Sequence, residues 1–493
     1  MKTFFKILSF LMCIVLLLPI TSCKNNDDAY VYFQLDELPQ TLDPQTAKSD
    51  VELLISQNLY EGLMRFDENG ELQYGVAKSH KKQGLTYTFK LRDDAKWKNG
   101  DKLTAYDFEF GFKRALSFDT AAPYASLLYC IKNAREINSG DLINLELGVK
   151  ALDDKTLKIE LCYDNPDFLK ILTLPISMPC NEEFFLSCKG KYGLDTDFTL
   201  SNGSYRLVKW GKEIFGIRLY RNKEYTGDFT AKNAAVFISH NKDLTAAETL
   251  LQNDADIAFV KSSDIDALKQ GGIKTAGTQN TVWFLTLSDK LPLDIRKSLT
   301  ILASSEIYSF TLSSGVSPAN SIFPPSLNTS VGANGLPTYN LDTAKALFTS
   351  SIKQMPDKKL PDDIKLYYYD NGFSKNMVTA IVGHWQNHLG AFINIEAVST
   401  PSVLESQLKS QDYYMSIFPV TVNSPSVAEY LSKFGIDYTS GDLTEIQTSL
   451  LSNSKLVPLA FESKTIAYSE SLANVKLQNG TSLDFAFIVK TED

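Results

Sequence analysis

Two serine–lysine pairs have a spacing that could support nucleophilic catalysis. Ser350 with Lys353, and Ser452 with Lys455, match the Ser-x-x-Lys spacing in which a lysine activates a serine. Neither pair has the Ser-Asp-Asn or Lys-Thr-Gly motif that accompanies this dyad in penicillin-binding proteins. The Gly-x-Ser-x-Gly, His-Glu-x-x-His, dinucleotide-binding and phosphate-loop motifs are absent as well. We therefore interpret both spacings as coincidental and expect no catalytic residues.

A pair of histidines is the other candidate for chemistry. His384 and His388 are four residues apart, which places two imidazoles on one face of a helix, where they could hold a metal. No third ligand can be identified, and only His80 and His240 remain elsewhere. With four histidines and no organised acid–base pair, we expect no metal site, no cofactor and no enzyme activity.

The amino terminus carries an export signal. Lys2 and Lys6 precede an apolar run over residues 7–20 that is too short to span a bilayer as a mature helix. Small residues then lead to Cys23, as in a bacterial lipoprotein signal. We expect residues 1–22 to be removed and Cys23 to be lipidated, the alternative being an ordinary secretory signal that happens to precede a cysteine.

The rest of the chain has the composition of a globular protein. Its 493 residues favour about three domains, and 44% of them are hydrophobic while 22% are charged. Residues 23–30 are a lipidated cysteine with a short polar tether, and no later segment approaches the roughly 20 apolar residues of a membrane span. The formal net charge of −9 becomes more negative when Lys2 and Lys6 are removed, which argues against nucleic acid as a partner. These features predict a body outside the cytoplasm that a lipid anchors to the membrane.

Four cysteines remain in the body of the chain: Cys130, Cys162, Cys180 and Cys188. An exported setting permits disulfides, and a Cys180–Cys188 bridge would close a small loop. Free buried thiols are the alternative, and the sequence does not decide between the two. No Cys-x-x-Cys pair is present, which argues against a zinc site.

Residues 86–116 contain the strongest local pattern. Apolar and polar residues alternate over 86–91, which predicts a half-buried strand. Asn99-Gly100 predicts a tight turn, because both residues tolerate positive φ. Thr104 and Asp107 then have the spacing of a capping box before an amphipathic helix. Farther along, residues 364–396 have the strand–helix–strand pattern of a parallel β–α–β unit.

The sequence of residues 86–108, TYTFKLRDDAKWKNGDKLTAYDF, resembles that of the bacterial extracellular solute-binding proteins of family 5. These are the oligopeptide- and dipeptide-binding subunits of ABC importers. LDP at 42–44, NLYEGL at 58–63 and LGVKALDDKTLKIEL at 147–161 carry the same resemblance, the last favouring the oligopeptide-binding branch. The resemblance is strong over residues 42–161, fair to 225 and patchy after 285.

The resemblance implies an α/β, two-lobed, periplasmic-binding-protein-like fold with an extra subdomain on the first lobe and a ligand cleft between the lobes. It divides the chain into lobe I (31–63, 193–288 and 465–493), domain II (64–192) and lobe II (289–464). We expect more than one strand to cross between the lobes, a hinge at 288–292, and terminal strands at 455–460 and 475–489.

The resemblance also implies where a peptide would bind. Peptide main chains are held by strand-like segments, with charged groups at the two peptide ends. The resemblance places these segments at Lys48 to Asp50 and at Ser416 to Phe418. The implied binding residues are Lys48, Ser49, Asp50, Tyr124, Ser416, Ile417, Phe418, Thr421 and Asn423. Tyr124 matches an aromatic residue that contacts the peptide, and Phe418 stands where the family has a tryptophan.

Two expected charges are missing from these positions. Counting back from Pro425, the acidic residue for a peptide's amino terminus falls on Thr421, and a basic residue for its carboxylate falls on Met415. Asp50 or Asn423 could compensate. The ligand is then a peptide bound by different end contacts, a modified peptide, or an uncharged solute.

The predicted function is that of a monomeric, lipid-anchored protein that captures oligopeptides or a related solute by hinge closure and delivers them to an ABC permease. Two alternatives remain open. One is a receptor for a non-peptide or signalling ligand, and the other is a surface scaffold that has kept the fold and lost the cleft.

Overall fold

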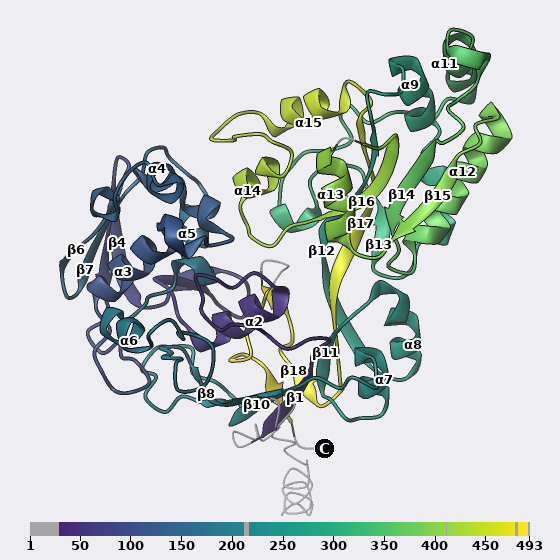
Figure 1. Cartoon of the computed structure of the whole chain (residues 1–493). Coiled ribbons are helices and arrows are strands. Elements are labelled where there is room, and N and C mark those ends of the chain that lie inside the picture. The colour runs from purple at the N-terminus through teal and green to yellow at the C-terminus, as the bar shows by residue number, and fades with distance from the viewer. Residues whose placement is uncertain (1–28, 212–215, 411, 479–481, 492–493) are drawn as a thin grey trace, which may run out of the picture.

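The computed structural model describes residues 29–211, 216–410, 412–478 and 482–491. The chain forms two lobes joined by one large mixed sheet, as Figure 1 shows. This arrangement confirms the predicted two-lobed α/β fold. The predicted signal peptide, the predicted lipidation site Cys23 and nearly all of the predicted tether lie outside the described residues.

Lobe I is built on three parallel strands, with β1 between β10 and β11. β9 and β8 continue the sheet antiparallel on the β10 side. The elements of lobe I are β1 (Tyr30–Gln34), α2 (Asp50–Leu59), β8 (Tyr205–Gly211), β9 (Gly216–Arg221), β10 (Ala235–Ser239), α7 (Ala246–Leu251), β11 (Ile257–Val260), α8 (Ile265–Gln270), β18 (Leu472–Ala473), β19 (Leu477–Gln478), β20 (Ser482–Leu483) and β21 (Val489–Lys490).

Residues 64–192 carry a separate antiparallel sheet of four strands in the order β4-β5-β7-β6. The strand and helix predicted from residues 86–116 are confirmed as β5 and α3, and the Asp107 carboxylate accepts the Thr104 N–H at 2.7 Å. The elements are β2 (Met64–Phe66), β3 (Leu72–Tyr74), β4 (Ala77–Gln83), β5 (Thr86–Leu91), α3 (Ala105–Leu116), α4 (Ala134–Ser139), β6 (Val149–Asp153), β7 (Thr156–Glu160), α5 (Phe168–Ile171) and α6 (Glu182–Ser187).

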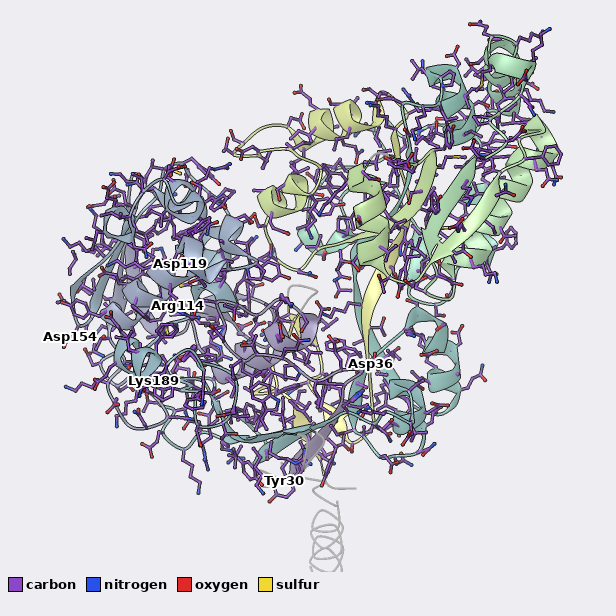
Figure 2. The ribbon with its side chains drawn as sticks, in the orientation of Figure 1. Tyr30, Asp36, Arg114, Asp119, Asp154 and Lys189 are labelled. Carbon is purple, nitrogen blue, oxygen red and sulfur yellow. The ribbon has the colours of Figure 1, made fainter. Side chains whose placement is uncertain are left out.

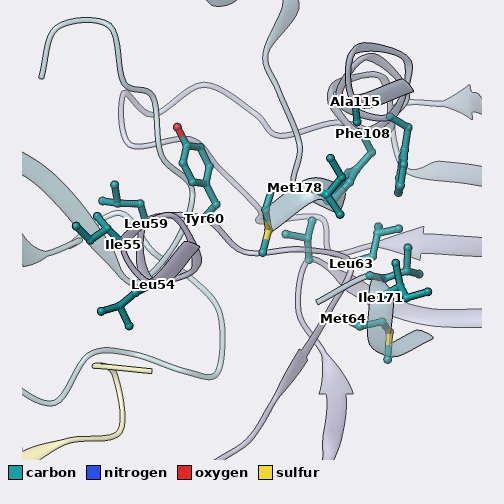
Figure 3. Packing of buried hydrophobic residues seen from close by; sticks show 14 of the residues in the cluster. Leu54, Ile55, Leu59, Tyr60, Leu63, Met64, Phe108, Ala115, Ile171 and Met178 are labelled. Carbon is teal, nitrogen blue, oxygen red and sulfur yellow. The ribbon is translucent and has the colours of Figure 1, made fainter. Parts of the chain in front are cut away.

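This part shares one hydrophobic core with lobe I. Leu54 and Leu59 of α2 belong to the same buried cluster as Phe108 of α3 and Ile171 of α5, and Figure 3 shows these side chains filling the space between the elements. Burial of large apolar side chains contributes about 1.5–3 kcal/mol for each, so a continuous core favours movement of the two parts as one body.

Two buried ionic contacts reinforce this union. Arg114 of α3, labelled in Figure 2, donates to the Asp43 carboxylate (2.8 Å) and to the Gln45 side chain (2.6 Å). Glu61, whose side chain is 2% exposed, accepts from Arg65 and Arg92, each at 3.0 Å. Because a buried carboxylate is stable only when its charge is paired, these contacts fix the segments around residues 43 and 61 against α3 and β5.

Lobe II is built on the part of the large sheet that has the strand order β15-β14-β16-β12-β17, and β13 also pairs with β17. β14 and β15 pair in parallel, and α12 connects them along the chain, which confirms the predicted β–α–β unit. The elements are α9 (Leu293–Ile301), α10 (Ser305–Tyr308), β13 (Val316–Pro318), α11 (Leu341–Ile352), β14 (Lys365–Tyr369), α12 (Ser374–Leu389), β15 (Asn394–Val398), α13 (Pro401–Ser410), β16 (Met415–Thr421), α14 (Val427–Ser432) and α15 (Leu443–Leu451).

Two long strands, β12 (Lys274–Leu287) and β17 (Leu456–Tyr468), cross from one lobe to the other. They pair antiparallel from Lys274–Tyr468 to Thr286–Leu456, with irregularities after Gln279 and after Trp283. β11 of lobe I pairs with the last part of β17, whereas β16 of lobe II pairs with the last part of β12. The expectation of more than one crossing strand is therefore confirmed.

Residues 288–292, where we expect the hinge, follow β12 on the lobe II side, and Leu291 is fully buried in the lobe II core. One local expectation is wrong. The strands expected over 475–489 are reduced to two-residue pieces. There the Asn58 side chain takes the place of a strand partner: it donates to the Leu483 carbonyl and accepts the Phe485 N–H.

The four described cysteines are free thiols. Cys130 and Cys180 are buried, and burial raises the pKa of each to about 12. Of the two alternatives left open by the sequence, the structure has the free thiols.

A half-buried carboxylate lies on one of the crossing strands. Glu462 of β17 accepts from Trp283 Nε1 at 2.8 Å, from Ser262 Oγ at 3.2 Å, and from Asn371 Nδ2 at 3.1 Å. Ser262 follows β11 of lobe I, whereas Asn371 follows β14 of lobe II, so this carboxyl group joins the lobes at the crossing. Burial raises the pKa of Glu462 above its ordinary value of 4.5, and the three hydrogen bonds only partly oppose this effect.

We expect Glu462→Gln to remove a pH dependence of stability. As the pH rises through 4.5, the unfolded chain loses this proton first, so the stabilisation by Glu462 is lost as the pH rises through the higher folded-state pKa. The difference in free energy of unfolding between wild type and Glu462→Gln should therefore fall with rising pH in urea titrations. Glu306→Gln, at an exposed position, is the control. Parallel profiles for wild type and Glu462→Gln would contradict this expectation.

Candidate functional site

A chamber, open to solvent at its mouth, lies where the two lobes and residues 64–192 meet. Its lining residues come from both sides of the crossing strands: Asp50, Leu53, Leu54, Gln57, Tyr124, Leu127, Leu174, Pro175, Ile176, Phe259, Asn423, Lys464 and Ser482. Three of the predicted binding residues, Asp50, Tyr124 and Asn423, are thereby brought together.

The expected strand-like segment 48–50 is instead the start of a helix. Ser49 is the N-cap of α2, and Asp50 is its first helical residue. The Glu52 carboxylate accepts the N–H groups of Lys48 (2.9 Å) and Ser49 (3.1 Å), so neither donor is free for a ligand. Burial raises the pKa of Glu52, but these backbone hydrogen bonds outweigh it and hold the pKa below its ordinary value. The Ser-x-x-Glu spacing was a capping-box signal that could have predicted this helix start.

The second expected segment lies inside the sheet. Met415, Ser416 and Ile417 pair with β12 on one side and with β14 on the other. Because strands pair with them on both sides, their main chain has no free edge. All three residues are buried, and Met415 does not line the chamber. Phe418 is half-buried, and its ring lies 6.0 Å from that of Phe284 in the core of lobe II rather than lining the chamber.

Beyond Phe418, β16 is no longer paired with β14. Val422 donates its N–H to Asn280 on the β12 side, so Thr421 and Pro419 direct their backbone groups to the opposite edge. Pro419 has no N–H to offer there. The Thr421 carbonyl already accepts from Lys433 Nζ at 2.6 Å, and that ammonium lies 3.2 Å from the Glu429 carboxylate. The Lys433 ammonium therefore lies beside Thr421, the position where the resemblance places the contact for a peptide's amino terminus.

Tyr124 connects the parts that meet at the chamber. Its hydroxyl donates to the Lys48 carbonyl at 3.2 Å and also has a hydrogen-bonding contact with the Asn423 side chain. Burial raises the pKa of Tyr124, so the hydroxyl stays protonated near neutral pH. The contacts join residues 64–192 to the start of α2 and to the end of β16.

Sequence reasoning missed one charged residue of the chamber, Lys464. Its Nζ lies 2.8 Å from Asp50 Oδ2 and 4.9 Å from the centre of the Phe259 ring. Lys464 and Asp50 are 414 positions apart, and no local pattern could have paired them. The only signal was a lysine within an otherwise strand-like C-terminal run.

A second chamber lies between α4 and the region of α14, and Leu127 lines both chambers. Across its rim, Arg135 of residues 64–192 contacts Asp437 of lobe II at 3.0 Å. Both side chains are more than half exposed, so this bridge contributes at most about 1 kcal/mol. The two chambers together form the cleft between the lobes.

A family model of bacterial extracellular solute-binding proteins, family 5 Middle, matches residues 71–442. The chain belongs to family 5 of the solute-binding proteins. It is 29% identical over 392 residues to the oligopeptide-binding protein OppA of Bacillus subtilis, which covers 76% of this chain and 72% of that protein. It is 25% identical over 397 residues to the probable deoxycholate-binding periplasmic protein YgiS of Escherichia coli, covering 77% of this chain and 72% of that protein.

The fold of this family 5 protein also matches solved structures. The murein tripeptide binding protein MppA of Escherichia coli superposes with a TM-score of 0.76 at 18% identity, over 95% of this chain and 100% of that one. The resemblance inferred from the sequence motifs is thereby confirmed.

The histidine pair of α12 lies away from the chamber. His384 and His388 have ring centres 4.3 Å apart, and His384 Nε2 lies 3.3 Å from the Tyr339 hydroxyl. Within the described ranges, no three histidine, cysteine or acidic side chains are grouped as a metal site. No helix in those ranges is long and apolar enough to cross a bilayer.

We expect Tyr124→Phe to lower the free energy of unfolding by about 1 kcal/mol, because it removes a hydroxyl that bridges three parts of the chain. Urea denaturation provides the measurement. Tyr74→Phe is the matched control, since the Tyr74 hydroxyl contacts only His80 on the exposed face of β4. Equal stability of Tyr124→Phe and wild type would show that the bridge contributes nothing.

Proposed function

We propose that this protein is the substrate-binding subunit of an ABC importer, which captures oligopeptides or a related solute outside the cell and delivers them to a membrane permease. Lipidation of Cys23 would hold it, as a monomer, at the outer side of the cell membrane. The binding residues would be those that line the chamber, with Asp50, Tyr124 and Asn423 among them. Residues 64–192 would act as domain II, attached to lobe I.

One observation carries this proposal: the chamber is built by both lobes at the point where β12 and β17 cross between them. A ligand in such a position contacts both lobes only when they are closed, so binding and closure favour each other. Membership in family 5 and the oligopeptide-binding relatives support the same interpretation.

A non-peptide ligand is the second candidate. The walls of the chamber are mostly apolar, and the relative YgiS is named for probable binding of deoxycholate, an amphipathic solute. A rigid apolar body would fit such walls by burial alone and would need few main-chain hydrogen bonds.

Thermal unfolding of the mature chain from Lys24 separates these candidates. We expect a mixed peptide pool to raise the melting temperature, because a ligand at 100 times its Kd adds about 2.7 kcal/mol of stability. Deoxycholate, added separately, should do so only if the second candidate is correct. A chain that responds to neither would favour the surface scaffold instead.

The chamber itself is tested by Leu53→Trp, which places a larger side chain into it from α2. This variant should fold and lose the response to peptides. Leu145→Trp introduces the same change at a position that is 80% exposed, and it should respond like the wild type. An unchanged response of Leu53→Trp would place the ligand elsewhere.

A further inference from the structure

The charged side chains that line the cleft are already paired with charges of the same chain. In the first chamber, Asp50 contacts Lys464 at 2.8 Å. In the second, Arg135 contacts Asp437 at 3.0 Å, and Glu429 lies 3.2 Å from Lys433. Among the described lining residues of both chambers, each acidic or basic group thus has an opposite charge beside it.

In each of the two pairs nearest the chamber walls, one side chain is largely withdrawn from water and its partner is more exposed. Side-chain exposure is 17% for Lys464 against 53% for Asp50, and 10% for Glu429 against 31% for Lys433. A ligand ammonium that approaches Asp50 meets the Lys464 ammonium, and a ligand carboxylate that approaches Lys464 meets the Asp50 carboxylate. A charged ligand end must therefore break an internal pair or stay close to a like charge, and both cost binding free energy.

The remaining polar groups of the first chamber are neutral. Gln57, Tyr124 and Asn423 offer amide and hydroxyl groups, which can bind peptide N–H and C=O groups but cannot neutralise a charge. Apart from the uncharged Ser482, the other lining residues are apolar, and Leu127 and Ile176 among them are buried. Such a surface is complementary to an apolar ligand with uncharged polar groups.

We propose that this cleft selects peptides whose enclosed part is apolar and carries no charged end, and that the Asp50–Lys464 pair enforces this selection. End-blocked peptides and internal segments of longer chains satisfy this condition, whereas short peptides with free ends do not. The proposal rests on the proposed function, since it names the class of peptide that the same site takes.

Isothermal titration of the mature protein tests the proposal with one mixture of apolar pentapeptides in four forms. The forms have both ends free, only the amino end acetylated, only the carboxyl end amidated, or both ends blocked. The doubly blocked form should bind at least about tenfold more tightly than the free form. Equal or tighter binding of the free form would overturn the proposal, as would preferential binding of a second pentapeptide mixture that contains lysine and glutamate.

Two charge-removing variants should shift the selection in opposite directions. Asp50→Asn leaves Lys464 unpaired, so it should improve binding of the form with a free carboxylate. Lys464→Met leaves Asp50 unpaired, so it should improve binding of the form with a free amino end. Lys78→Met, which breaks the exposed pair with Asp93, is the control and should change no preference.

A merely structural role of the pair would weaken all four forms alike in both variants, and that result would overturn the assignment of Asp50 and Lys464. Failure of both mixtures and of the mixed peptide pool to bind would instead contradict the proposed function itself.

Discussion

The structure depends on the antiparallel pairing of β12 with β17. One part of this strand pair lies in lobe I, where β11 pairs with β17. The other part lies in lobe II, where β16 pairs with β12. The ladder has two irregularities: the one after Gln279 precedes the part of β12 that pairs with β16, and the one after Trp283 lies within that part. Irregularities of this kind bend and twist a strand pair locally. Near the crossing, β17 carries Lys464, which lines the chamber together with Phe259 of β11, and it also carries Glu462, which bonds Trp283 of β12. The chamber walls and the crossing strands are therefore parts of one unit.

Much of the fold could be predicted from local patterns. The alternation of apolar and polar residues predicts strand β5, and the capping box predicts the start of helix α3. The β14–α12–β15 unit is predicted by apolar residues whose spacing changes from that of a strand to that of a helix and back. Predictions failed where distant contacts decide the local structure. In the C-terminal run, Asn58, more than 400 positions away, pairs with the Leu483 carbonyl and the Phe485 N–H in place of a neighbouring strand.

The site was less predictable than the fold. Asp50, Tyr124 and Asn423 were named from the resemblance, and all three line the chamber. Ser416 to Phe418 was expected to bind a peptide main chain, yet β14 covers Ser416 and Ile417, and strand pairing of this kind has no signature in a short sequence. Lys464 was missed because its partner lies at the other end of the chain. The capping box at Ser49 was readable, and it overrides the strand-like interpretation of that segment.

The proposed function requires that the cleft encloses a peptide. Native mass spectrometry of the mature chain from Lys24, purified gently and compared before and after unfolding, detects such a ligand. We expect bound masses that disappear on unfolding and whose differences correspond to amino-acid residues. Bound masses that form no such series would contradict the claim in favour of another solute. A chain that carries no ligand and binds none from a broad peptide pool would contradict it altogether.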